Sequence, residues 1–422
     1  LELRLGGRAS RKMVYDWRDG AWHHVALTWD GDDVTLYIDG RSPSSGGNAA
    51  KPERVDGVVL GNGLGATVFD EIVPLPGPLP PDEAARLAKI SLSGKIARSN
   101  PIVTVTPMAT PPTLDGVLED GEWDDAAGYS NFSKHFSSRF PSANRMTRTW
   151  WAWDEERFYM AFRIPMTQPH GKEKRPRDKI RFGDKTVEVF FMPNPSGELE
   201  YFQLAFDSLG TVYDSRMMDH TYNPDWQVAC RRDEEFWTAE VAVPYKAVNA
   251  LDPEPGHRWK MNVVATSGQW SPSGTFHEFN RFGMVKFAKD TPSLNVGTLT
   301  RKGNTLAVPY RATGPGGELT LKANVYPSKG IEAIDSARKT LTGDDASGEL
   351  TLDLGEHTNG LVEIVAFQEA GDPLYHRFIE FYPEYFGAVT LLKDLPEEIK
   401  NPEPKKVKKD APADERKKAQ EE

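Results

Sequence analysis

The chain has almost no cysteine: Cys230 is the only one in 422 residues. An internal disulfide, a CxxC redox pair and a Cys-based zinc cluster each need at least two thiols, so the sequence excludes all three and leaves the redox compartment open. It also has no run that approaches the roughly 18 apolar residues of a membrane-spanning helix. We therefore expect no membrane span.

Basic residues are in the minority. Lys and Arg number 51 against 62 Asp and Glu, which gives a formal net charge of −11. Proteins that bind nucleic acid neutralise phosphates with a basic stripe, so this balance argues against a nucleic-acid partner. Neutral or cationic ligands fit the charge better.

Recognisable catalytic motifs are missing as well. The sequence contains no GxSxG, P-loop or HExxH motif. His23 and His24 are adjacent in an expected strand and point to opposite faces, so they do not make a local metal pair. We expect a chain that is not an enzyme.

Aromatic residues and short alternating segments are abundant. The chain has 11 Trp, 20 Phe and 13 Tyr, and apolar and polar residues alternate in short segments between turn residues. This pattern predicts an all-β protein made of tandem β-sandwiches. The expected parts are a partial jelly roll at 1–90, a linker at 91–106, a sandwich at 107–290, a β spacer at 295–386 and a disordered charged tail at 393–422.

The first part contains a hairpin signal. Residues 22–29 and 34–38 alternate on either side of an Asp30-Gly31 turn, which predicts two antiparallel strands. Further strands are expected at 58–60 and 66–72, before the segment PLPPDEAARLAK. This order resembles the C-terminal half of a laminin-G-like, concanavalin A-like jelly roll. Its segment FDEI at 69–72 lacks the third carboxylate of the E-x-D-x-x-E pattern of glycosidases with that fold.

Composition separates the later parts. Residues 91–112 are rich in Ser, Pro and Thr, as linkers are, and eight of the eleven Trp fall between 107 and 290. Strands are expected there at 149–153, 158–164, 186–191, 201–206, 236–243 and 259–264. Residues 295–386 predict an immunoglobulin-like or fibronectin-like spacer with strands at 305–310, 318–325, 349–354 and 360–366. The Lys, Glu, Asp, Pro and Ala of 393–422 cannot bury a core.

The central part carries six motifs in the order of one known family. They are Leu114-Asp115-Gly116 with Glu122-Trp123, WDEERFY at 153–159, TVEVF at 186–190, FDSLGTVYD at 206–214, WTAEVAVPY at 237–245, and Phe282-Gly283. In this order they resemble carbohydrate-binding module family 9. Lys185 stands where that family has Asp, and Ala265 where Arg is common.

The resemblance implies a sugar held between two aromatic rings with polar groups around its rim. By position, Phe182 and Trp270 correspond to the rings, and Glu188, Arg216 and Asn262 to the polar rim. Each has a plain structural alternative: loop packing for Trp270, core packing for Phe182, and a solvated strand edge for Glu188. Trp150, Trp151 and Trp153 are expected mainly in the core, as are Trp123, Trp237 and Trp259.

The resemblance implies non-catalytic binding of a polysaccharide or oligosaccharide in an extracytoplasmic carbohydrate-degrading system. The chain would be extracellular, on the cell surface or periplasmic, although no signal peptide can be read from its start, and its partners would be glycan and a linked glycoside hydrolase or cell-surface protein. The alternatives are a haem b-binding sandwich, with Met217, Met218 and His220 as the ligand cluster, and a purely structural or adhesion array. No cofactor is expected except a structural calcium ion, for which Asp30–Asp33 and the loop from Asp115 offer oxygens; turn chemistry explains these Asp residues equally well.

Overall fold

A computed structural model describes residues 2–5, 8–12, 24–30, 33–40, 79–88, 98–134, 141–167, 171–194, 200–265, 268–273, 275–314, 317–330, 332–342, 345–368 and 373–389. The charged tail predicted at 393–422 lies outside these residues, as do the strands expected at 58–60 and 66–72. No helix in the described part of the chain is long and apolar enough to cross a membrane.

The N-terminal part contains the expected hairpin. Its elements are β1 (Glu2–Leu5), β2 (Arg8–Lys12), β3 (Val25–Asp30), β4 (Asp33–Ile38) and α1 (Pro81–Leu87). β3 and β4 pair antiparallel with Asp30 opposite Asp33, as the turn signal predicts. The backbone N–H of Leu79 donates to Thr28 Oγ1 (2.8 Å), and Ala84 of α1 packs with Tyr37 and Leu79. These contacts hold the short helix against the hairpin.

The rest of the described chain forms two large sheets. The first is 12-stranded and contains β5 (Ile102–Val105), β7 (Ser133–Lys134), β10 (Val187–Met192), β11 (Phe202–Phe206), β12 (Val212–Arg216), β15 (Arg258–Ala265), β16 (Gly268–Gln269), β17 (Gly283–Phe287), β21 (Leu319–Pro327), β22 (Asp335–Leu341), β24 (Gly360–Phe367) and β25 (Tyr375–Phe381). Its main path runs β12-β11-β10-β15-β17-β5-β25-β24-β21-β22.

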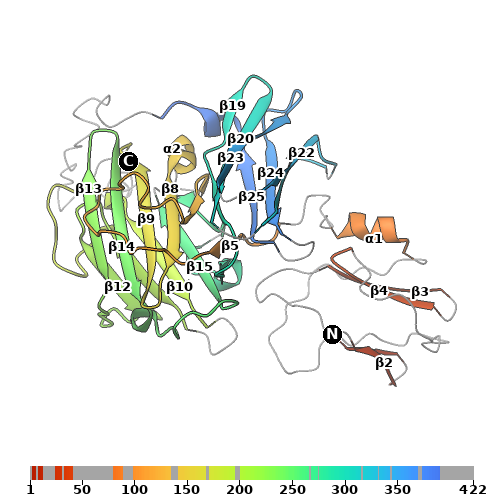
Figure 1. The fold of residues 1–422 in the computed structure, drawn as a ribbon, viewed down its shortest axis with the longest axis horizontal. Helices are drawn as coiled ribbons and strands as arrows, with labels where there is room; N and C mark the ends of the chain where they lie inside the picture. The colour runs from red at the N-terminus through yellow and green to blue at the C-terminus, as the bar shows by residue number, and fades with distance from the viewer. Residues whose placement is uncertain are drawn as a thin grey trace, which may run out of the picture.

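The second sheet is 9-stranded and contains β6 (Ala127–Tyr129), β8 (Arg148–Trp153), β9 (Arg157–Pro165), β13 (Gln227–Arg232), β14 (Phe236–Pro244), β18 (Ser293–Val296), β19 (Thr300–Lys302), β20 (Thr305–Thr313) and β23 (Asp345–Asp353). The short helices are α2 (Pro141–Met146), η1 (Phe182–Asp184), η2 (Tyr245–Val248), η3 (Phe279–Arg281) and η4 (Pro383–Phe386). The two sheets face each other over one apolar cluster that extends from Val103 to Tyr385, so the fold is all-β and sandwich-like (Figure 1).

The tryptophans supply much of this core. Trp151, Trp153, Trp237 and Trp259 are buried in the large cluster, and Trp123 in a smaller one. The prediction that these rings are core residues is confirmed. Trp150 is half-buried beneath the guanidinium of Arg148, which lies 4.9 Å from its ring.

The predicted linker contains a strand. β5 occupies Ile102–Val105, and all four of its residues are buried. It pairs parallel with β17 and antiparallel with β25. The expected linker at 91–106 contains the β-branched segment Ile-Val-Thr-Val, so this part of the prediction needs correction: 102–105 belong to the sheet.

The central segment and the spacer share both sheets. β5 joins them in the first sheet, and β18 joins them in the second by pairing with β6 on one side and β20 on the other. Figure 1 shows the green and yellow strands continuing into the cyan and blue strands. Hydrogen bonding is therefore continuous across residues 291–294, where the sequence suggests a boundary between two domains.

The opening motif of the central segment is fastened to β14. Glu240 Oε2 accepts the backbone N–H groups of Asp115 (3.0 Å) and Gly116 (2.9 Å), and Oε1 accepts Trp123 Nε1–H (3.1 Å). Gly116 has φ +82°, and a Cβ there would lie 2.7 Å from the carbonyl carbon of Cys230. The motifs "LDG", "EW" and "WTAEV" are thus brought together in the fold, because Asp115, Gly116 and Trp123 all donate hydrogen bonds to Glu240.

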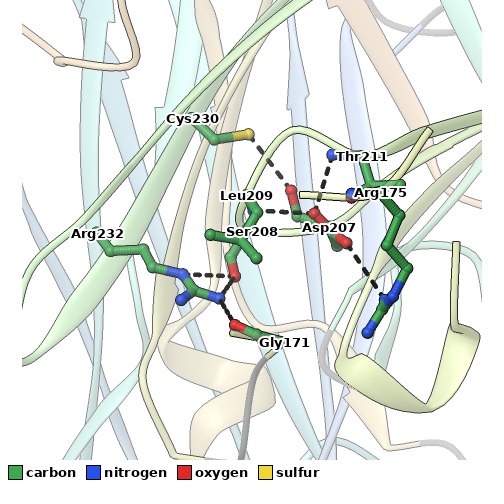
Figure 2. A network of polar contacts seen from close by, with 8 residues as sticks. All are labelled: Gly171, Arg175, Asp207, Ser208, Leu209, Thr211, Cys230 and Arg232. Atoms are coloured by element: carbon green, nitrogen blue, oxygen red, sulfur yellow. Dashed lines mark hydrogen bonds and ion pairs between the residues drawn. The ribbon is translucent and has the colours of Figure 1, made fainter. Parts of the chain in front are cut away.

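A second motif fixes the turn from β11 to β12 (Figure 2). Asp207 Oδ1 accepts the N–H groups of Leu209 (2.9 Å) and Thr211 (3.0 Å), as an Asp in a tight turn does. Cys230 Sγ donates to the carbonyl of Asp207 (3.4 Å). Arg232 on β13 donates to Ser208 Oγ and to the carbonyl of Gly171. This turn sets the register of β12.

Candidate functional site

The candidate site is the outward face of the first sheet over β10, β11, β12 and β15. Strand alternation builds it. On β10, Val187, Val189 and Phe191 enter the large core, so Glu188 and Phe190 point to the other face. A polar residue and a large ring therefore alternate with core residues on one strand.

Glu188 is the central polar group of this face. Its side chain is 9% exposed, and Gln203 Nε2 on β11 donates to its Oε2 (2.8 Å). In register it lies between Ala205 on β11 and Val264 on β15. Burial raises the pKa of Glu188 to about 7, although the Gln203 hydrogen bond lowers it. Among the described residues, Gln203 is its one hydrogen-bond donor, whereas a carboxylate has about four lone-pair sites.

Aromatic and hydroxyl groups flank this carboxylate on the β12 side. Tyr213 lies across β11 from Glu188, because both pair with Ala205. Its hydroxyl lies 2.6 Å from His220 Nδ1. Phe182 of η1 meets the Tyr213 ring edge to face at 5.3 Å and is 46% exposed. Burial raises the pKa of Tyr213, so its hydroxyl keeps its proton.

The other end of the face is covered by residues 275–282. His277 lies 5.2 Å from the Phe190 ring and 5.7 Å from the Tyr201 ring. Phe279 packs on Tyr201 at 4.5 Å. Burial lowers the pKa of His277, which favours the neutral imidazole. This end is an apolar wall beside the polar group.

Trp270 does not lie on this face. Its ring is 1% exposed in the large core, 4.8 Å from Trp151 and 5.9 Å from Tyr129. Its neighbours Ser271 and Pro272 suggested an exposed loop, yet the ring turns inward above Gly283. The missing side chain of Gly283 makes room, because a Cβ there would lie 2.4 Å from the indole. The structural alternative, packing of this ring, is what the structure shows.

The side-chain amide of Asn262 forms its hydrogen bonds within the fold. It is buried, and its Oδ1 accepts the N–H of Ser271 (2.9 Å) while its Nδ2 donates to Gln269 Oε1 (3.2 Å). It pairs with Phe190 in register and so shares the sheet face with Glu188. Its amide shapes the segment after β15 and leaves no exposed polar group there.

Arg216 lies at the end of β12 and points away from Glu188. It pairs with Phe202, a core residue, so alternation places it on the opposite side of the strand from Tyr213. Its guanidinium forms an exposed ion pair with Glu200 (2.5 Å). Of the five residues that the resemblance implies, Phe182 contacts Tyr213, and Glu188 lies across β11 from the same Tyr213.

The sequence does not predict three residues of this face: Gln203, Tyr213 and His277. Gln203 and Tyr213 carry a usable signal, since they alternate with core residues of strands that pair with β10. His277 has none, because its contacts come from an irregular segment.

Several residues proposed as metal or haem ligands form hydrogen bonds with nearby parts of the chain. Asp115 Oδ1 accepts the N–H of Val117 (2.7 Å), and the described residues contain no group of three or more His, Cys, Asp or Glu side chains that could hold a metal. The side chains of Asp30–Asp33 lie outside the described ones, and calcium stays a prediction. Met217 Sδ accepts the N–H of Tyr201 (3.3 Å), and Met218 is exposed.

Comparisons with known proteins bear on the N-terminal part of the chain first. Residues 6–71 match the model of the concanavalin A-like lectin/glucanases superfamily, which confirms the N-terminal resemblance. No curated protein matches the chain.

Solved structures similar to the chain include a carbohydrate-binding module family 9 from Caldicellulosiruptor kristjanssonii. Its complex with cellotriose is 12% identical, with TM-score 0.34, over 45% of this chain and 95% of that one. Its complex with glucose is 11% identical, with TM-score 0.33, over 45% and 97%. A glycosyl hydrolase family 2 member from Bacteroides cellulosilyticus is 10% identical, with TM-score 0.18, over 53% of this chain and 28% of that one.

Proposed function

We propose that the chain is a carbohydrate-binding protein whose sugar site, with no catalytic role of its own, is the sheet face around Glu188. The observation that carries the proposal is a buried carboxylate with one hydrogen-bond donor, placed beside the Tyr213 and Phe182 rings. Sugar hydroxyls donate to a carboxylate, and the C–H face of a pyranose ring packs on an aromatic ring. The six motifs that resemble carbohydrate-binding module family 9 support the same reading.

The setting of this binding is part of the proposal. The protein would hold a linked glycoside hydrolase or a cell surface close to polysaccharide, outside the cytoplasm. A second sugar site on the N-terminal part would raise avidity, because the second binding event becomes intramolecular. Such a site would lie within residues 6–71, the segment that matches the concanavalin A-like model.

The test is calorimetry on the full chain with glucose, cellotriose, xylo-oligosaccharides and a wider glycan array. We expect one of them to bind, Glu188→Gln to weaken it by about 10- to 100-fold, and Phe182→Ala by about 5- to 10-fold. Glu240→Gln is the matched control, since Glu240 is also buried but serves the fold. Trp270→Ala does not serve here, because removing a core ring costs about 3–5 kcal/mol of stability.

Other outcomes identify the alternatives. Absence of any glycan binding together with a haem-like absorption band on reconstitution would replace the sugar site with the haem site, and Met217, Met218 and His220 would be mutated next. A chain that binds neither ligand would be a structural or adhesion array.

A further inference from the structure

A second polar cluster lies on the outward face of the spacer half of the first sheet. Asn324 on β21 pairs with Glu363 on β24 and, on its other side, with Ser336 on β22. His376 on β25 stands two residues before Phe378, the register partner of Glu363. Diagonal neighbours on one face are within reach of long side chains, so register brings His376 to Glu363.

Hydrogen bonds connect this cluster in series. His376 Nε2 lies 3.0 Å from Glu363 Oε1, and His376 Nδ1 lies 3.0 Å from Ser99 Oγ. An ionised carboxylate only accepts, so Nε2 carries a proton. In the neutral ring Nδ1 is then an acceptor, and the Ser99 hydroxyl donates to it.

The carboxylate at the end of the series is firmly held. Asn324 Nδ2 (2.8 Å) and the Tyr326 hydroxyl (2.9 Å) both donate to Glu363 Oε2. Ser336 Oγ in turn donates to Asn324 Oδ1 (2.8 Å). Burial by itself would raise the pKa of Glu363, but the hydrogen bonds from His376, Asn324 and Tyr326 outweigh it and lower the pKa to about 2. Glu363 is therefore ionised at neutral pH.

The chain holds Ser99 in place from both sides. Arg98 forms an ion pair with Glu380 of β25 (2.5 Å), and Asn100 Nδ2 donates to the carbonyl of Phe282 (3.2 Å). Ser99 is half-buried and the His376 side chain is 17% exposed. The hydroxyl is thus positioned on the imidazole at a place that solvent reaches.

We propose that Ser99, His376 and Glu363 form a nucleophile–base–carboxylate triad that accepts an acyl group from an ester. The three residue types are those of serine acyl transfer, in the order serine, histidine, carboxylate, with the roles of the two imidazole nitrogens exchanged: Nδ1 faces the serine and Nε2 the carboxylate. This activity is separate from sugar binding, because none of the three residues belongs to the face around Glu188. The substrate class is an activated ester, such as an aryl ester, whose leaving group departs with little assistance.

The proposed step balances within these residues and water. Ser99 Oγ bonds to the acyl carbon, the bond from that carbon to the leaving oxygen breaks, and the Ser99 proton passes through His376 Nδ1 to the leaving group. Glu363 balances the charge of the transient imidazolium. Water then attacks the acyl carbon with His376 as base, which releases the acid and restores the Ser99 hydroxyl.

The test treats the full chain with p-nitrophenyl acetate and with a fluorophosphonate probe, and maps adducts by peptide mass spectrometry. We expect a single adduct on Ser99. Ser99→Ala and His376→Gln should each slow adduct formation at least tenfold, and Ser347→Ala, an exposed serine on β23, should not change it. Ser99→Cys keeps a nucleophile at the same place and should form a thioester, which separates chemistry from misfolding.

Glu363→Gln gives a readout that a purely structural role would not move. Glu363→Gln should slow the acylation of Ser99 at least tenfold while circular dichroism stays unchanged. Two results would overturn the proposal: no adduct on Ser99, or equal adducts on Ser99 and on scattered lysines and serines. The three residues would then only hold the chain before β5 against β25.

Discussion

Two buried glutamates differ in how many hydrogen-bond donors surround them. Burial raises the pKa of both Glu188 and Glu240 to about 7. Glu240 accepts three N–H groups, from Trp123 and from the backbone of Asp115 and Gly116, so the fold uses it. Glu188 accepts one side-chain amide. A buried carboxylate that lacks donors costs stability, and binding sites commonly carry such a cost.

That cost predicts a pH dependence of stability. The folded-state pKa of Glu188 is about 7 and the unfolded one about 4.5, so between these values the folded chain binds more protons and its stability falls as pH rises. Glu188→Gln removes the titrating carboxyl group and with it this dependence of the unfolding free energy on pH. At pH 8 the variant should be about 1–3 kcal/mol more stable than wild type, and at pH 4.5 nearly equal. Urea denaturation at pH 4.5, 6, 7 and 8 measures it; a difference that does not change with pH would contradict it.

At this scale the sequence predicts some site residues and not others. Glu188 and Phe182 could be found because motif spacing and strand alternation are local. Trp270 could not be placed, since the glycine that receives its ring, Gly283, lies thirteen residues further along the chain and leaves no local pattern. Tyr213 depends on the register of β12, which the Asp207 turn sets.

Strand elements follow closely from alternation. Strands expected at 158–164 and 236–243 are found at Arg157–Pro165 and Phe236–Pro244. β22 (Asp335–Leu341) was missed because it is an edge strand with mostly exposed side chains. β5 was missed because it is short and flanked by proline.

The loop that opens the central segment gives a prediction at the scale of an element. Gly116→Ala would place a Cβ 2.7 Å from the backbone of Cys230 at a φ of +82°, and the loop would leave Glu240. We expect a loss of about 2–4 kcal/mol from strain and lost hydrogen bonds. Gly121→Ala is the control, with φ +87° and no atom within 4 Å, and should cost only about 1 kcal/mol. Equal losses of stability in thermal melts of the two variants would argue against a structural role for the contact between this loop and Glu240.

The whole molecule depends on pairings between distant segments. Val103 pairs with Tyr375, and Asn295 lies beside Gly128. Gly128 has room for nothing larger, because a Cβ would lie 2.4 Å from Asn295. Sequence alternation reports each strand's own faces but not its partner, so the union of the central segment and the spacer could not be predicted.

Asn131 forms hydrogen bonds that connect the central segment with the spacer, so its substitution tests how far the two depend on each other. It has φ +59°, its Oδ1 accepts Leu299 N–H (2.8 Å) and the Tyr385 hydroxyl (3.1 Å), and its carbonyl accepts from buried Arg377 (2.7 Å). Asn131→Ala leaves buried groups unsatisfied and should cost about 2–5 kcal/mol. Asn249→Ala, at a similar φ of +50° but on the surface, should cost about 1 kcal/mol. Similar losses would contradict the assigned role.

Shared sheets and one core imply that residues 98–389 unfold together. Hydrogen exchange on the full chain should show β5, β17 and β25 losing protection in one step, with the same free energy and the same urea dependence, because opening any of them breaks the sheet that the others complete. Asn131→Ala should then lower protection in β10 and β24 alike, although neither strand contains the mutation. If β21, β24 and β25 exchanged first while β10 and β15 stayed protected, the spacer would be a separate cooperative unit, and the sugar site would not depend on it.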